Sequence, residues 1–142
     1  MIRRLRRAVL LLLLGPAGLA AQQEAIVEQL ATLVAAEDAR DFRPELFRGA
    51  LVAPDSLVRR MAAVSAGRIG DYRATPLLLP LLGDPDSTVR IAAAFGLGLL
   101  RDTAAVRPLM DRLTGFPALD ATSAAETLTA LAKIGGPAVG EF

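Results

Sequence analysis

The sequence contains no cysteine, no histidine and no tryptophan, and the first two absences each exclude a class of chemistry. Without cysteine there is no disulfide, no thiolate nucleophile, no Cys-ligated zinc and no lipid on a signal-peptide cysteine. Without histidine there is no imidazole-dependent dyad or triad and no His-ligated metal. These residues alone therefore offer no complete catalytic site, and we expect no cofactor and no bound metal.

Aromatic side chains are also few, with five Phe and one Tyr among 142 residues. Alanine and leucine dominate, and 53% of the residues are hydrophobic, which is enough to bury the core of one ordinary domain. This composition favours closely packed helices over a β-sandwich, which draws on β-branched and aromatic residues. We therefore expect an all-α protein.

Residues 1–21 have the pattern of a secretory signal peptide. Four arginines in residues 3–7 precede an apolar run at 8–14 that ends at Gly15-Pro16, and small residues then allow cleavage before Ala21 or Gln22. The run is shorter than the roughly 20 residues that span a bilayer. We predict export to the periplasm or the extracellular space, with removal of this segment. The alternatives are an uncleaved anchor or a basic arm for nucleic acid.

Removal of the signal would change the charge balance. Four of the sixteen basic residues and none of the fifteen acidic ones lie in residues 1–21, so the mature chain would carry a net charge of −3. A mildly acidic chain without a basic stripe does not suit binding to a phosphate backbone. We therefore predict no nucleic-acid partner and, after signal removal, no membrane.

Two stretches of the mature chain repeat one another: APDSLVRRMAAVSAGRIGD over 53–71 and GDPDSTVRIAAAFGLGLLRD over 83–102. Val58-Arg59 aligns with Val89-Arg90 at an offset of 31 residues, and fainter copies flank the two. Such a period is typical of solenoids built from helix pairs. We predict a repeat domain over 22–142, with repeats near 22–52, 53–83, 84–116 and 117–142, the last incomplete.

The sequence of each copy predicts two helices joined by a tight turn. Ser56 and Ser87 are placed to cap the first helices, and small residues beside an apolar stripe would let neighbouring helices approach closely. In the second helix Thr75 and Pro76 suit the N-cap and N1 positions, whereas Pro80 should bend or shorten the element. The predicted buried stripe of the first copy consists of Leu57, Val58, Met61, Val64 and Ile69.

The motif DSxVRxxAAxxxGxxxD, followed by ATPLLLPLLGDPD, resembles the HEAT repeat, especially the short HEAT-like repeats of phycobilisome lyase subunits. The resemblance covers nearly all of the mature chain and is clearest over 54–113. It implies an α-solenoid of antiparallel helix pairs, about three and a half repeats long, that offers an extended surface to another macromolecule. It does not imply pigment-lyase activity, because nothing in the chain matches a bilin site.

The resemblance also implies roles for charged residues. In such repeats the motif's Arg and Asp are usually structural, so we expect inter-repeat hydrogen bonds and ion pairs at Arg59, Arg90, Asp71 and Asp102. Second helices line the concave side of HEAT-like solenoids. Exposed polar positions there form the candidate partner-binding surface: Arg48, Arg73, Arg107, Asp111 and Arg112. As an alternative, Arg107 and Asp111 pair only with one another, because they lie four residues apart.

Two groups of carboxylates invite a functional interpretation. Asp84 and Asp86 resemble part of a calcium loop, but too few oxygen ligands follow, so turn and cap chemistry is expected. Glu37, Asp38 and Asp41 lie near a turn without an opposing acid, which indicates a solvated face.

Two hypotheses about function follow. The first is a non-catalytic HEAT-like scaffold that mediates protein–protein interaction in an exported bacterial protein. The second is the N-terminal repeat region of a longer exported enzyme, for example a peptidyl-prolyl isomerase or a protease, with its catalytic domain beyond residue 142. After Pro137 the sequence shows neither core leucines nor a polar cap, so we expect further repeats, a catalytic domain or a covering partner.

Overall fold

The computed structural model describes residues 15–115 and 119–135, and these are helical with no strand. The elements follow one another as α2 (Pro16–Asp38), α3 (Pro44–Leu51), α4 (Ser56–Ile69), η1 (Tyr72–Ala74), α5 (Thr75–Leu78), η2 (Leu79–Gly83), α6 (Ser87–Leu100), η3 (Thr103–Ala105), α7 (Val106–Thr114) and α8 (Ala121–Gly135). The prediction of an all-α solenoid is confirmed.

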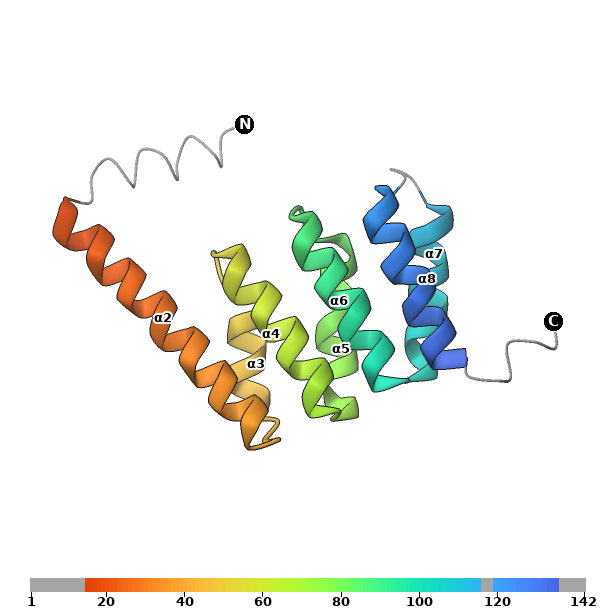
Figure 1. The fold of residues 1–142 in the computed structure, drawn as a ribbon, viewed down its shortest axis with the longest axis horizontal. Helices are drawn as coiled ribbons and strands as arrows, with labels where there is room; N and C mark the ends of the chain where they lie inside the picture. The colour runs from red at the N-terminus through yellow and green to blue at the C-terminus, as the bar shows by residue number, and fades with distance from the viewer. Residues whose placement is uncertain (1–14, 116–118, 136–142) are drawn as a thin grey trace.

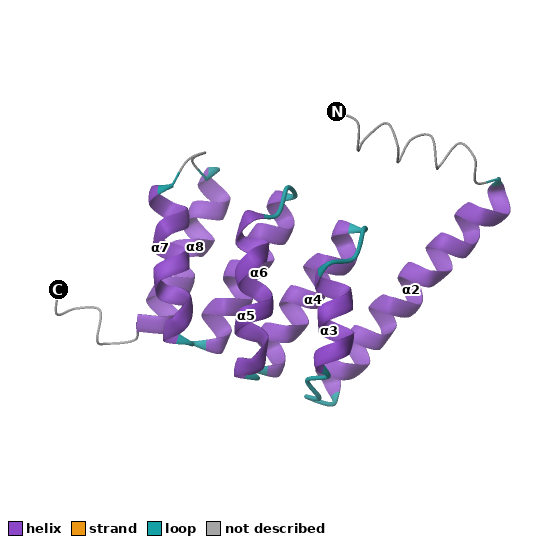
Figure 2. Ribbon diagram, turned by 180° about the vertical axis from the view of Figure 1, so that it is seen from behind, coloured by secondary structure: helices purple, strands orange, loops and turns teal. Residues whose placement is uncertain are grey.

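The helices form two layers (Figures 1 and 2). Helices α2, α4, α6 and α8 lie side by side in the first-helix layer, where α4 packs on α2 and α6, and α6 packs on α8. Helices α3, α5 and α7 form the second-helix layer behind them. The repeat boundaries predicted at 53 and 84 fall in the connections before α4 and α6, and the boundary at 117 lies outside the described residues.

Aspartates cap the first helices, one residue before the predicted serines. The Asp55 carboxylate accepts hydrogen bonds from the N–H groups of Leu57 (2.8 Å) and Val58 (3.4 Å). Asp86 does the same for the N–H of Thr88 at 2.9 Å. The prediction for Ser56 and Ser87 is therefore wrong by one position, because each serine is already the first helical residue. A carboxylate is an equally good N-cap and also suits the positive end of the helix dipole.

The second helix of the middle repeat is shorter than a regular helix because of its prolines. Thr75, the predicted N-cap, is the first residue of α5, and Ala74 precedes it as the last residue of η1. Pro80 has no N–H to donate, and the chain changes from α5 to the 3₁₀ turn η2 just before it. The shortening expected at Pro80 is confirmed.

Helix α2 runs without a break through the predicted cleavage site. It begins at Pro16, and the apolar run predicted at 8–14 lies outside the described residues. The buried residues of α2 are Leu33 and Ala36, both near its C-terminal end, so the residues before Gln22 add no buried side chain. Among the described residues, no helix combines the length and the hydropathy needed to cross a membrane.

The tightest packing in the first-helix layer is a backbone contact between α4 and α6. A Cβ built on Gly67 would lie 2.4 Å from the Cα of Gly96, and one built on Gly96 would lie 2.7 Å from the carbonyl oxygen of Ala63. Only glycine allows two helices to come this close. The two residues define what we call the Gly67–Gly96 seam.

We expect Gly67→Ala to destabilise the protein. Alanine is favoured over glycine in a helix by about 1 kcal/mol, but here its methyl group would meet backbone, and overpacking costs about 1–3 kcal/mol or more. Gly49→Ala is the control, because Gly49 is also helical and its Cβ would meet nothing within 4 Å. Urea denaturation should show a loss for Gly67→Ala and an unchanged or higher stability for Gly49→Ala. Equal effects would contradict the seam.

Candidate functional site

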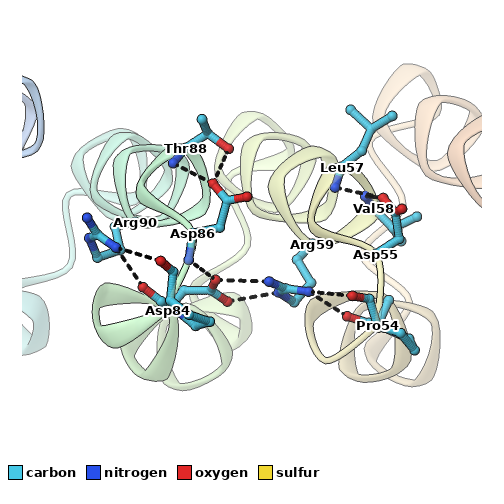
Figure 3. A network of polar contacts seen from close by, with 11 residues as sticks. Pro54, Asp55, Leu57, Val58, Arg59, Asp84, Asp86, Thr88 and Arg90 are labelled. Atoms are coloured by element: carbon cyan, nitrogen blue, oxygen red, sulfur yellow. Dashed lines mark hydrogen bonds and ion pairs between the residues drawn. The ribbon is translucent and has the colours of Figure 1, made fainter. Parts of the chain in front are cut away.

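Arg59 joins the second and third repeats (Figure 3). Its guanidinium donates two parallel hydrogen bonds to the Asp84 carboxylate, from Nε to Oδ2 (2.8 Å) and from Nη2 to Oδ1 (2.9 Å). Its Nη1 donates to the carbonyl oxygens of Ala53 (2.8 Å) and Pro54 (3.1 Å). Only 13% of the Arg59 side chain and 8% of the Asp84 side chain are exposed. Such a bidentate pair fixes both distance and orientation between neighbouring repeats.

Arg90 makes the equivalent connection one repeat later. Its Nη1 donates to the carbonyl oxygens of Asp84 (2.8 Å) and Pro85 (3.2 Å), and its Nη2 donates to the Asp120 carboxylate before α8 at 3.3 Å. Arg59 and Arg90 therefore form an arginine ladder along one end of the first-helix layer. The side chains of both arginines therefore connect one repeat to the next, as expected.

The structure does not place Asp71 and Asp102 in this ladder. Gly70 and Arg101 end α4 and α6 in the left-handed region, with φ of 81° and 54°, and the turn directs each following aspartate at the next 3₁₀ helix. Asp71 accepts from the N–H of Arg73 (2.9 Å) and Asp102 from that of Ala104 (3.0 Å). The expectation of inter-repeat bonds at these two aspartates is wrong, because both act as local caps.

Hydrogen bonds keep several carboxylates ionised. The Thr88 hydroxyl, then the Ser56 hydroxyl of the preceding repeat, lower the pKa of Asp86 to about 2. The Ser123 hydroxyl and N–H lower the pKa of Asp120 to about 2. A general acid needs a raised pKa instead. These residues therefore serve as caps.

Glu37 on α2 is the third carboxylate of this kind. Burial alone would raise the pKa of Glu37, but hydrogen bonds from Ser65 and Arg68 outweigh it and lower the pKa. The two donors reach it at 2.7 Å and 2.9 Å, respectively. The two hydrogen bonds from Ser65 and Arg68 hold α2 against α4.

The carboxylates that suggested a metal or acid site do not converge. Asp84 is occupied by Arg59 and Asp86 by Thr88. Asp41 lies 3.5 Å from Arg43, and Glu37 faces α4. The described part of the chain contains no group of three or more acidic side chains that could hold a metal ion.

A groove runs along the outer side of α4 and α6, with a volume of about 520 Å³, and we call it the first-helix groove. Met61 and Val64 from α4 and Ile91 and Phe95 from α6 provide its apolar lining. All four residues are partly exposed, and Met61 and Val64 pack against the core. Helical periodicity placed Met61 and Val64 in the buried stripe, so sequence reasoning missed this groove.

Charged side chains border the groove. Arg60 and Arg68 lie on its α4 side, and Glu126 reaches it from α8. Arg68 is paired with Glu37, and Glu126 lies 4.0 Å from Lys133. Arg60 is exposed and forms no ion pair or side-chain hydrogen bond with any described residue. Among the described residues, the groove thus combines an apolar surface with one arginine that has no ion pair, at its α4 side, and with Glu126 at its α8 side, whose Oε1 accepts no hydrogen bond.

The sequence profile of HEAT repeats matches residues 43–129, from the start of α3 into α8. The chain belongs to the HEAT repeat family. No curated protein matches the chain. As a HEAT repeat protein it is a helical repeat scaffold of a kind that typically mediates protein–protein interaction.

The partner-binding residues predicted on the second-helix layer of this HEAT repeat protein are mostly engaged in local pairs. Arg48 pairs with Glu45, Arg73 with Asp71 at 2.7 Å, and Arg107 with Asp111 at 2.8 Å. The structure brings Arg107 and Asp111 together, as the alternative interpretation expected. Arg112 follows them on α7, whereas Arg48 on α3 and Arg73 on η1 belong to other elements. Arg112 is half-buried, and its Nε has no hydrogen-bond partner among the described residues.

A second concavity, of about 610 Å³, lies between α7 and α8 of the HEAT repeat domain. It is strongly apolar, and Met110 and Leu128 at its edge are 51% and 56% exposed. Gly135 also lines it, at the point where the described residues end.

We expect Arg59→Ala to destabilise the HEAT repeat domain far more than Arg107→Ala does. Removing Arg59 would leave the buried Asp84 carboxylate without its charged partner and with only the Asp86 N–H as a donor among the described residues, and breaking a buried pair costs about 3–5 kcal/mol. The Arg107–Asp111 pair is exposed and four residues apart on one helix, so its loss costs only about 0.5 kcal/mol or less. Chemical denaturation of both variants measures the difference. Similar losses would show that the ladder does not hold the repeats together.

Proposed function

We propose that this chain is a non-catalytic HEAT repeat scaffold that binds a protein partner in its first-helix groove, within an exported bacterial protein. The observation that carries the proposal is the groove itself, which exposes an apolar lining and the unpaired Arg60 on a frame fixed by the arginine ladder. Exposed apolar surface bordered by charge is characteristic of protein-binding sites. The 31-residue spacing supports repeats of the short HEAT-like variety.

The polar side chains of the frame support a role without catalysis. Asp55, Asp86 and Asp120 are occupied as helix caps, Glu37 is occupied by Ser65 and Arg68, and the chain has no histidine or cysteine. The pKa values of Glu37, Asp71, Asp86 and Asp120 are all lowered, whereas a general acid requires a raised pKa. The partner is a protein, because one unpaired arginine beside Glu126 does not suit a phosphate backbone.

Export rests on the signal pattern in residues 1–21, and the packing of α2 is compatible with it. Cleavage before Ala21 or Gln22 would shorten α2 but remove no buried side chain, since Leu33 and Ala36 are its buried residues. The packing of α4 on α6 and of α6 on α8 involves no residue before Gln22. We place the mature protein in the periplasm or outside the cell.

Site-specific photo-crosslinking in a bacterial host tests the proposal. A benzophenone side chain at Met61 lies in the first-helix groove, whereas the same group at Arg48 or Arg107 lies on the second-helix layer. We expect a protein adduct at Met61 and none at the other two positions. The chain recovered from the exported fraction should begin at Ala21 or Gln22.

Each alternative gives a different result. An adduct only at Arg48 or Arg107 would move the binding surface to the second-helix layer. The absence of any adduct would contradict the scaffold function, and a chain that stays in the cytoplasm with Met1 intact would contradict export.

A further inference from the structure

The first-helix groove has the dimensions of a short helical segment. Arg60 and Arg68 at its border are eight residues apart on α4, which corresponds to about 12 Å at the helical rise. That length accommodates two turns of a helix, whose side chains at positions i, i+4 and i+7 face one side. Met61, Val64 and Phe95 would lie beneath those side chains.

The groove favours a helix over an extended segment. Its walls are the helices α4 and α6, whose backbone N–H and C=O groups are used within each helix. An extended segment would find no strand edge to pair with and would leave its own backbone groups unpaired against apolar side chains. A helix satisfies these groups internally.

The charge of the groove selects an acidic helix. Arg60 has no ion pair among the described residues, and it lies on the same side as Arg68. A carboxylate opposite Arg60 would form an ion pair with the one α4 side chain at the groove border that has none among the described residues. The occupant therefore needs acidic residues at one end and apolar residues along one face.

Helix α2 of the same chain has these properties. Its 23 residues include four acids and no lysine or arginine. Val27 and Val34 are 64% and 39% exposed, and with the exposed Ala31 they occupy positions i, i+4 and i+7. Glu24 and Glu28 are exposed beside them and form no ion pair with any described residue.

This face of α2 is exposed among the residues that the structure describes. Leu33 and Ala36 attach α2 to the rest of the domain through a different side of the helix. Toward its N-terminus α2 leans away from α4 (Figure 1). A second molecule can therefore approach Glu24, Val27 and Glu28 while α2 stays in place.

We propose that the first-helix groove of one molecule binds α2 of a second copy, with Glu24 and Glu28 opposite Arg60 and the two valines over the apolar lining. This inference rests on the proposed function, and it names the partner as the chain itself. The scaffold would then assemble with its own copies. If the exchange is reciprocal, a closed dimer results, and if it is one-sided, an open chain results.

Sedimentation velocity of the purified protein over a range of concentrations tests the proposal. We expect association, and we expect Arg60→Glu to raise the concentration needed for it by about tenfold or more, which corresponds to about 1.4 kcal/mol. Glu24→Lys with Glu28→Lys should weaken association in the same way. Combining all three substitutions restores opposite charges across the contact and should restore association.

Arg107→Glu is the control, because Arg107 is also exposed but lies on α7 and does not line the groove. A closed dimer or an open chain with this pattern supports the proposal. A protein that stays monomeric at every concentration overturns it, as does association that Arg60→Glu leaves unchanged or that the triple variant fails to restore. Recovery in the triple variant would also show that Arg60→Glu folds. A monomeric protein that still forms an adduct with a different protein at Met61 would leave the scaffold function standing.

Discussion

The fold depends on how closely the helices of the first-helix layer approach one another. At the Gly67–Gly96 seam the backbones of α4 and α6 are in direct contact, and a single methyl group would separate them. A similar approach occurs between α6 and α8, where a Cβ on Gly98 would lie 2.9 Å from the Cα of Ala130. Where two helices approach this closely, only small residues fit at the contact, and the larger side chains lie on the two sides of it.

That spacing determines where the chain can bind. On the inner side, Leu78, Leu97 and Leu109 fill the space between the two layers and are fully buried. On the outer side, Met61 and Phe95 are left partly exposed and form the first-helix groove. The arginine ladder joins the repeats at one end of the same helices, so the groove lies on helices whose relative position the ladder fixes.

Much of this architecture could be predicted from the sequence, because the repeat of apolar and small residues determines which helices pack together. The Ala- and Gly-rich first helices, and the early end of α5 at Pro80, follow from local residue properties. The caps were misplaced by one residue because Asp55 and Ser56 are equally suited to the position, and only the backbone geometry decides between them. The groove could not be predicted, because the periodicity of Met61 and Val64 is the same at the edge of a core as inside it.

Hydrogen exchange of the native protein tests the central role of the seam most directly. Amides of α4 and α6 around Gly67 and Gly96 should exchange slowest, at the rate set by global unfolding, whereas amides of α2 before Gln22 should exchange fastest among the described helices. Exchange around Gly67 that is as fast as in the first turns of α2 would show that the domain opens at this contact. In that case another part of the structure would hold the repeats together.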